Sequence, residues 1–275
     1  MKPSEIEHIE VELLLEAVYQ RYGYDFRSYA RASIDRRVRQ FMSGKNVRLI
    51  SELIPCVLYD EALFSELAQY FSIAVTEMFR DPFVYCALRE KVVPLLKTYP
   101  FVKVWHAGCA TGEEVYSLAI LLKEEGLFDR VTIFGTDFND RALEQARQGI
   151  YPAERIKDFT RNYQEAGGKG SFSEYYHARY ESAALDASLK ERITFANHNL
   201  ATDAAFGEMH LVFCRNVLIY FNPELQNRAL RLFDESLVRG GFLCLGTKED
   251  IQFTEVAGGY DAVDSAARIY RKKVR

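Results

Sequence analysis

The segment from Trp105 to Glu114, with the sequence WHAGCATGEE, constrains the fold more than any other part of the chain. The stretch from Val102 to His106 has the character of a β-strand, and Gly108 and Gly112 follow it at once. Two acidic residues then open a helix. A strand, a glycine-rich turn and a helix in this order form the usual nucleotide-binding corner of an α/β sheet.

The two acids, Glu113 and Glu114, indicate which ligand suits this corner. The free N–H groups and the positive dipole end of a helix normally attract phosphate. Two carboxylates in the first turn complement that dipole themselves and repel a pyrophosphate, whereas they attract an amine and a sulfonium. The sequence therefore favours S-adenosylmethionine over NAD. A nicotinamide dehydrogenase is also disfavoured because Ala110 breaks the GxGxxG fingerprint.

Composition limits the class of protein. The chain has 275 residues, 48% of them hydrophobic, which is enough for one large domain or two modest ones. No apolar run approaches the roughly 18 residues that cross a bilayer, so we expect a cytoplasmic protein without membrane insertion. The five cysteines form no CxxC pair, and we expect neither disulfides nor a bound metal. A net charge of −4 argues against nucleic acid as a partner.

The N-terminal region, residues 5 to about 70, predicts a small helical domain, since Ile34, Val38, Phe41 and Met42 recur at helical spacing. Its basic residues gather in one stretch, which is either a solvated helix face or a docking surface for an acidic partner. The stretch contains Arg21, Arg27, Arg31, Arg36, Arg37, Arg39, Lys45 and Arg48.

From residue 100 the pattern alternates between strands and helices, which predicts a parallel sheet covered by helices. A helix is expected from Pro223 to Val238, with Asn222 as its cap and Gly240-Gly241 as its stop. A last strand near Arg268 to Lys272 would return antiparallel, as methyltransferase sheets commonly do. The other expected strands are Val102 to His106, Val131 to Thr136, Ile193 to Ala196, Leu211 to Cys214 and Phe242 to Gly246.

Residues 150 to 192 interrupt this alternation with several glycines and a tyrosine-rich run, Tyr175 to Tyr180. Two interpretations fit the segment. It is either an inserted small antiparallel unit or an extended ordered loop.

Asp137 ends the second expected strand and is a candidate ligand for ribose, because a carboxylate there can accept hydrogen bonds from both hydroxyls. The alternative is a capping role at the next helix, which Asn139 or Asp140 would fill instead. We favour the ribose role.

Two further segments carry candidate site residues. Arg215 and Asn216 follow a buried strand directly, where a polar side chain is costly unless it is paired, so an active-site role is favoured. Tyr220 is either a core aromatic or a ring that faces a sulfonium. Arg80 lies next to Asp81 between the helical region and the sheet, where the two are either an exposed pair or part of a site.

Five motifs in this order resemble the CheR-type chemoreceptor glutamate methyltransferases. They are Thr76 to Pro82, Gly108 to Ser117, Gly135 to Asp137, Gly149 to Tyr151 and Cys214 to Phe221, and the likeness covers nearly the whole chain. The resemblance implies an α/β fold, a class I S-adenosylmethionine-dependent methyltransferase (Rossmann-like) sheet with a small N-terminal all-helical domain and a small inserted β-subdomain. The domains would be 1–75 with a basic face, a linker helix 76–99 that contributes to the cofactor site, and 100–275 with an insertion at about 152–192.

The same resemblance implies roles for single residues. Thr76 and Arg80 would reach S-adenosylmethionine from the linker, Glu113 would hold its amino group and Asp137 its ribose. Asn199 and Leu200 would flank the adenine, and Gly108, Cys214 and Arg215 would line the rest of the cofactor. The role of Glu114 is left open, with service to the helix dipole as the simplest alternative. Three positions depart from the family pattern: Ala74, Met78 and Val115.

The implied reaction is attack of a glutamate carboxylate on the cofactor methyl, which gives a methyl ester and S-adenosylhomocysteine. Arg80 and Tyr220 are expected near the reacting centre, with Arg215 as another group that orients the carboxylate. Chemoreceptor helices would dock on Arg36, Arg37 and Arg39, and a receptor C-terminal tail on the insertion. The alternatives are a catalytically weak cofactor-binding sensor or adaptor, and a methyltransferase that acts on another protein or a small carboxylate.

Overall fold

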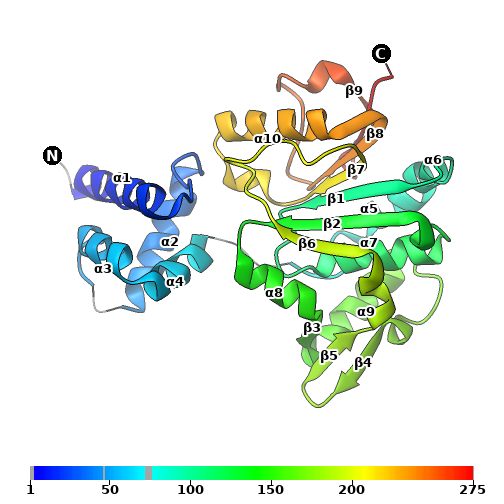
Figure 1. Cartoon of the computed structure of the whole chain (residues 1–275), viewed down its shortest axis with the longest axis horizontal. Coiled ribbons are helices and arrows are strands. Elements are labelled where there is room, and N and C mark those ends of the chain that lie inside the picture. The colour runs from blue at the N-terminus through cyan, green and yellow to red at the C-terminus, as the bar shows by residue number, and fades with distance from the viewer. Residues whose placement is uncertain (1–2, 46, 72–75, 275) are drawn as a thin grey trace. The chain divides into compact units, whose positions relative to one another are not determined.

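The computed structural model describes residues 3–45, 47–71 and 76–274 (Figure 1). The chain divides into two compact units, one formed by Met1–Ile73 with Ile219–Arg228 and the other by Ala74–Leu218 with Ala229–Arg275. The boundary that the sequence predicts after residue 75, and the departure at Ala74, lie outside the described residues. Assignment of residues 219–228 to the helical unit was not expected from the sequence.

The first unit is helical, as predicted. Its helices are α1 (Pro3–Tyr22), α2 (Arg31–Ser43), α3 (Leu53–Tyr59) and α4 (Glu61–Phe71). The expected stripe on α2 buries Ile34, Val38 and Phe41. Residues 219–228 join this unit through a backbone hydrogen bond from Ala30 N to Tyr220 O, 2.7 Å long.

The second unit is built on a seven-stranded sheet in the order β6-β2-β1-β7-β8-β10-β9 (Figure 1). The first five strands run parallel, and β10 returns antiparallel beside β8, which confirms the predicted fold class. The strands are β1 (Val102–Ala107), β2 (Val131–Asp137), β6 (Ile193–Asn197), β7 (Met209–Cys214), β8 (Leu237–Leu245), β9 (Tyr260–Asp264) and β10 (Ile269–Lys272). Strand β9 was not predicted.

Helix α10 (Pro223–Ser236) begins as expected, with the Asn222 side chain accepting a hydrogen bond from Leu225 N at 2.9 Å. Its predicted end is wrong. The helix stops at Ser236 and β8 starts at the next residue, so Gly240 and Gly241 lie inside the strand. The physical reason is a bulge: the register of β8 against β7 shifts here, and Gly240 takes φ +78°.

Helices cover both faces of the sheet. On one face, Val104, Ile133 and Phe213 share a buried cluster with α5 (Pro82–Ala87), α7 (Glu113–Glu124) and α9 (Ile156–Glu165). On the other face, the Trp105 ring lies 5.5 Å from Phe233 of α10. Helix α8 (Asp140–Gln148) connects β2 to the insertion. None of the helices in the described parts of the chain combines the length and apolar character needed to cross a bilayer.

The linker is only partly helical. Residues 76–81 are irregular, and α5 begins at Pro82, followed by a π-helical stretch (Leu88–Val92) and α6 (Val93–Leu96). Asp81 takes a left-handed φ of 53°, which is incompatible with helix before that point. The helix in the linker therefore begins six residues after the predicted start at residue 76.

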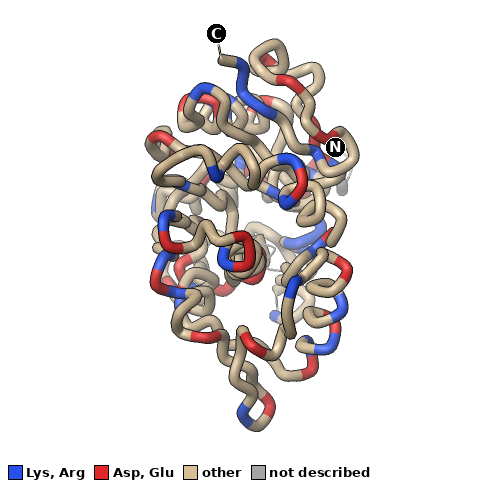
Figure 2. Tube along the Cα trace, turned by 90° about the vertical axis from the view of Figure 1, so that its right-hand side faces the viewer, with Lys and Arg blue, Asp and Glu red and all other residues tan. Residues whose placement is uncertain are grey.

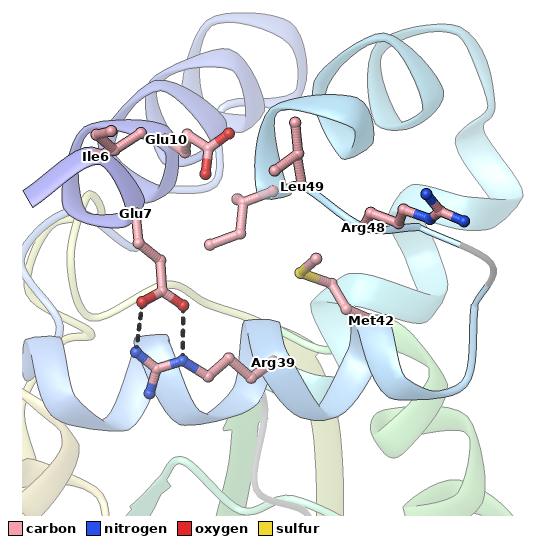
Figure 3. Close-up of a pocket in the computed structure, with 8 residues that line it drawn as sticks. Ile6, Glu7, Glu10, Arg39, Met42, Arg48 and Leu49 are labelled. Atoms are coloured by element: carbon pink, nitrogen blue, oxygen red, sulfur yellow. Dashed lines mark hydrogen bonds and ion pairs between the residues drawn. The ribbon is translucent and has the colours of Figure 1, made fainter. Parts of the chain in front are cut away.

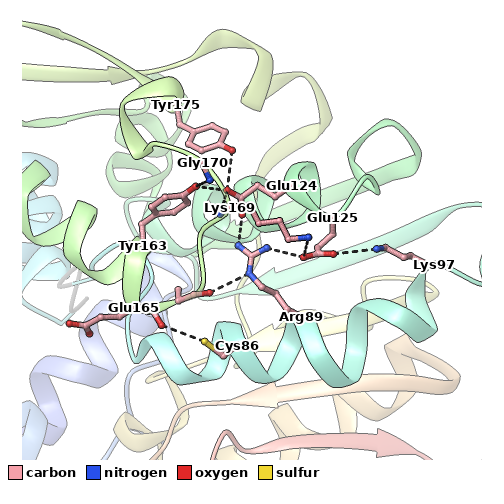
Figure 4. A network of polar contacts seen from close by, with 11 residues as sticks. Cys86, Arg89, Lys97, Glu124, Glu125, Tyr163, Glu165, Lys169, Gly170 and Tyr175 are labelled. Atoms are coloured by element: carbon pink, nitrogen blue, oxygen red, sulfur yellow. Dashed lines mark hydrogen bonds and ion pairs between the residues drawn. The ribbon is translucent and has the colours of Figure 1, made fainter.

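The insertion is a small antiparallel unit, the first of the two interpretations. Strands β3 (Ile150–Pro152), β4 (Tyr176–Arg179) and β5 (Ser182–Leu185) form a sheet in the order β3-β5-β4, and α9 accompanies it. A polar network joins this insertion to α7 (Figure 4). In it, Tyr163 donates to Glu124, and Arg89 pairs with both Glu124 and Glu125.

Ion pairs stabilise this network. Burial works to raise the pKa of Glu125, but hydrogen bonds from Lys169, Arg89 and Lys97 outweigh it and lower that pKa to about 2. A carboxyl group whose pKa is lowered by folding stabilises the protein at any pH above its ordinary pKa. That stabilisation is lost as the pH falls toward 2. The insertion is therefore anchored most firmly at neutral pH.

Substituting Gly135 with alanine is expected to destabilise the sheet. The added Cβ would lie 2.7 Å and 2.8 Å from two ring atoms of Phe195 on the neighbouring strand. We expect a loss of about 1–3 kcal/mol in the free energy of unfolding, measured by urea denaturation. Gly258→Ala is the matched control, because nothing lies within 4 Å of its added Cβ. Equal midpoints for the two variants would contradict the close packing of β2 on β6.

Candidate functional site

The carboxyl ends of β1, β2, β6 and β7 lie side by side at one edge of the sheet. Ligands of open α/β sheets bind outside such an edge. The segments that follow these strands carry most of the residues that the sequence singles out: the turn from Gly108 to Gly112, Asp137, the loop at Asn199 and the residues from Cys214 to Asn216.

The backbone of these segments is strained. Gly108 has φ +71°, and an added Cβ would lie 2.5 Å from Val217 Cγ2, so the turn requires glycine here. Ala110 and Asn216 also adopt left-handed φ values, 47° and 59°. Left-handed non-glycine residues tend to gather at binding sites, where the surrounding structure holds them in place.

Asp137 fastens the glycine turn to the end of β2. Its Oδ2 accepts a hydrogen bond from Ala110 N and its Oδ1 one from Asn139 N, both 2.9 Å long. Asn139 caps α8 by accepting from Arg141 N and Ala142 N, so the capping role that competed for Asp137 belongs to Asn139. Burial raises the pKa of Asp137. A carboxylate offers about four lone-pair sites, so it can accept a ligand hydroxyl in addition to these backbone N–H groups.

Glu113 has no exposed surface, and both of its oxygens have partners. Oε2 accepts from Thr111 Oγ1 at 2.6 Å, and Oε1 accepts from Arg155 Nη1 at 2.9 Å. Burial raises the pKa of Glu113, and the contacts with Thr111 and Arg155 work against that rise. Arg155 comes from the insertion. The sequence did not predict its contact with Glu113, because no residue spacing links an arginine in the insertion to that glutamate.

Glu114 does more than complement the helix dipole. Its Oε1 accepts from Arg215 Nη1 and, at 3.4 Å, from the Tyr85 hydroxyl. Burial raises the pKa of Glu114, and the charges of Arg215 and Arg80 oppose the rise. The role of Glu114, which the sequence left open, includes this buried ion pair.

Arg215 is held inside the unit, with no exposed side-chain surface. Nη1 also donates to the backbone oxygen of Arg80 at 2.9 Å, and Nη2 pairs with Asp81. Protein oxygens thus engage both terminal nitrogens of Arg215, and the predicted contacts of Cys214 and Arg215 with the cofactor, and of Arg215 with a substrate carboxylate, stay predictions. Cys214 is also fully buried, so its side chain belongs to the core.

Arg80 and Thr76 occupy the linker beside these ion pairs. Arg215 fixes the Arg80 backbone, and the Arg80 guanidinium forms no hydrogen bond or salt bridge with another described residue, although its charge acts on Glu114. The Thr76 carbonyl accepts a hydrogen bond from Arg155 Nη2. Their predicted contacts with cofactor and substrate stay predictions.

The loop after β6 is fixed by hydrogen bonds of its own. Asn199 accepts from Ala201 N through its side chain, and its backbone N–H donates to Asp203, both at 2.9 Å. Leu200 is buried. His198 N donates to Asp137 O at 3.1 Å, which places this loop beside Asp137. The adenine contacts of Asn199 and Leu200 stay predictions.

Arg37 is not available for docking as predicted. It is 4% exposed, its Nη1 donates to Phe71 O at the C-terminus of α4, and its guanidinium lies 5.1 Å from the Tyr220 ring centre. A cation satisfies the free carbonyls and the negative end of a helix, which explains this position. Tyr220 thus belongs to the helical unit, and its predicted place near the reacting centre stays a prediction.

The rest of the predicted basic face is largely neutralised within its own unit. Arg39 forms two hydrogen bonds with Glu7, 2.7 Å and 2.8 Å long, beside a pocket of about 490 Å³ (Figure 3). Arg27 and Lys45 also pair with acids, and Figure 2 shows basic and acidic residues interspersed along the chain. Of the three predicted docking residues, only Arg36 is exposed without a partner among the described residues.

The residues at this edge fit S-adenosylmethionine. Glu113 and Asp137 supply anionic oxygens suited to an ammonium group and to ribose hydroxyls. A carboxylate at the start of α7 is unsuited to a pyrophosphate. Sheet order, turn and acids together define the class of protein as an S-adenosylmethionine-dependent methyltransferase.

Comparison with known proteins places the chain more narrowly. The family described as "CheR methyltransferase, SAM binding domain" matches residues 74–263, and "CheR methyltransferase, all-alpha domain" matches residues 9–72. The chain belongs to the CheR methyltransferase family. The Pseudomonas putida protein Cher3 is 51% identical to this chain, and the match covers 96% of this chain and 97% of the length of Cher3.

Other relatives are more distant. The chemotaxis protein methyltransferase of Listeria innocua is 30% identical over 83% of this chain and 85% of its own length. That of Borreliella burgdorferi is 27% identical over 88% of each chain. The predicted family and cofactor are confirmed.

Breaking the Glu114–Arg215 pair is expected to cost much stability. Arg215→Met leaves Glu114 and Asp81 without their counter-charge, and we expect a loss of about 3–5 kcal/mol in the free energy of unfolding at pH 7. Adding Glu114→Gln should recover part of that loss. The double variant should therefore lose less unfolding free energy than the sum of the losses in the two single variants. Urea denaturation measures all of these values.

The exposed pair Arg231–Glu255 provides the matched control. Arg231→Met should change stability by less than about 1 kcal/mol. Strict additivity of Arg215→Met and Glu114→Gln would show that the two charges are not coupled.

Proposed function

We propose that this protein transfers a methyl group from S-adenosylmethionine to glutamate side chains of chemoreceptors, in the cytoplasm. The observation that carries the proposal is the pair of buried carboxylates at the glycine turn, Glu113 and Asp137, in a chain of the CheR methyltransferase family. The names of the Listeria and Borreliella relatives, chemotaxis protein methyltransferases, support the choice of substrate.

The chemistry asks for little acid or base assistance. A glutamate side chain, with a pKa of about 4.3, is already an anion at neutral pH. S-adenosylmethionine, when bound, supplies a methyl group on a positively charged sulfur. The protein therefore has to remove water from the substrate carboxylate and align it behind that methyl, so that positioning provides most of the rate.

Each residue at the edge of the sheet has a part in this positioning. Glu113 binds the cofactor's amino group, Asp137 its ribose, and Asn199 with Leu200 its adenine. Arg80 orients the substrate carboxylate, since Arg215 holds its backbone while its guanidinium forms no hydrogen bond or salt bridge with another described residue. Tyr220, which belongs to the helical unit and not to the edge of the sheet, is proposed as a second orienting group.

The receptor would be held at two places. Arg36 offers an exposed charge on α2 for an acidic receptor helix. The order β3-β5-β4 leaves β4 at an edge of the inserted sheet, and Tyr180 beside it is 89% exposed. An extended receptor tail can add to such an edge by backbone hydrogen bonds.

The test is transfer of labelled methyl from S-adenosylmethionine to receptor cytoplasmic fragments. We expect a labelled receptor that releases methanol in mild alkali, because carboxyl methyl esters hydrolyse there. The control is the same fragment with its methylated glutamates changed to alanine, which should stay unlabelled. A label that survives alkali would indicate N- or C-methylation, and cofactor binding without any transfer would favour a sensor over an enzyme.

A further inference from the structure

We propose that Arg155 binds the carboxylate of the cofactor's methionyl group, beside the amino group held by Glu113. The inserted subdomain would then supply half of the site for the cofactor's amino-acid end. The inference rests on the placement of the amino group at Glu113 that is part of the proposed function. It assigns a binding role to a residue that no sequence pattern singled out.

Arg155 joins three segments of the chain at one point. Its Nη1 donates to Glu113 Oε1 at 2.9 Å, and its Nη2 donates to the backbone oxygen of Thr76. The first contact reaches the start of α7 and the second reaches the linker. The guanidinium therefore lies where both predicted cofactor-binding segments meet.

The charge arrangement matches an α-amino acid group. A zwitterion carries an ammonium and a carboxylate on one carbon, and it is complemented by an acid and a base held side by side. Glu113 and Arg155 present that pair. Arginine has five N–H donors, and its contacts with described residues use two of them, so donors remain for a planar carboxylate.

Exposure separates the two partners. The Glu113 side chain is 1% exposed, whereas that of Arg155 is 35% exposed. An ion pair that served only to neutralise a buried acid would need no accessible surface on the base. The exposed part of Arg155 is the part that a ligand can still contact.

Neighbouring contacts hold Arg155 in position. Its guanidinium lies 4.8 Å from the ring centre of Phe159, one turn along α9. The Tyr151 hydroxyl donates to Thr111 O at 2.8 Å, and Asn162 Nδ2 donates to Met78 O at 3.1 Å. The insertion is thus fastened to the cofactor turn and to the linker on either side of Arg155, which limits the entropy lost on binding.

The test compares three ligands by calorimetry: S-adenosylhomocysteine, its analogue without the carboxylate, and its analogue without the amino group. In the wild type, loss of the carboxylate should weaken binding at least about tenfold, as expected for a charge-assisted hydrogen bond. In Arg155→Ala this penalty should shrink to less than about twofold, while Arg155→Lys should keep part of it.

Arg161→Ala is the matched control, since Arg161 lies on α9, which begins directly after Arg155, and pairs only with the exposed Asp158 among the described residues. Its carboxylate penalty should equal that of the wild type. Thermal unfolding checks that each variant is folded, and Arg155→Gln replaces Arg155→Ala should the latter not fold.

An unchanged carboxylate penalty in the folded Arg155 variants would overturn the proposal, even with all affinities lowered, because Arg155 would then act only on Glu113. The analogue without the amino group reports on Glu113 separately: its binding should be weakened in the wild type and not further in Glu113→Gln. Since no receptor enters these measurements, failure of receptor methylation would leave their outcome unaffected.

Discussion

The two buried acids at the start of α7 each require a guanidinium, and this requirement organises the second unit. An isolated buried carboxylate is strongly unfavourable, so each acid must be paired. Glu113 forms an ion pair with Arg155 of the insertion, and Glu114 forms one with Arg215 of the segment after β7. The insertion and the segment after β7, which are far apart in the sequence, are thereby held beside one glycine turn, and the linker is held there too because both arginines also bond to its backbone.

This arrangement gives the two neighbouring glutamates different tasks. Glu114 and Arg215 are both inaccessible, so their pair supports the linker that carries Arg80. Glu113 is equally buried, but its partner reaches the surface. The first pair is suited to building the site and the second to contacting a ligand. A charged corner that repels phosphate thus becomes suited to a cationic nucleoside with an amino-acid end.

Local patterns predicted the fold, and they selected the glycine turn and Asp137, which the structure brings together. Strand alternation and the glycine turn located β1, β2 and β7, and the end of β2 located Asp137, because these signals lie in adjacent residues. The partners of the acids were not predictable in this way: Arg155 and Arg215 are 42 and 101 residues from their glutamates, and only the sheet order brings them together. The docking residues in the basic stretch were mostly mispredicted because they, too, depend on contacts between distant residues. Charge along the sequence does not reveal that Arg37 is buried or that Arg39 forms an ion pair with Glu7.

A crystal structure of the protein with S-adenosylhomocysteine tests the central claim most directly, namely that Glu113 and Asp137 hold the two polar ends of the cofactor. We expect a carboxylate oxygen of Glu113 within about 3.2 Å of the cofactor's amino nitrogen, and the Asp137 carboxylate within the same distance of the ribose hydroxyls. An amino group bound elsewhere, or a ribose turned away from Asp137, would contradict the claim.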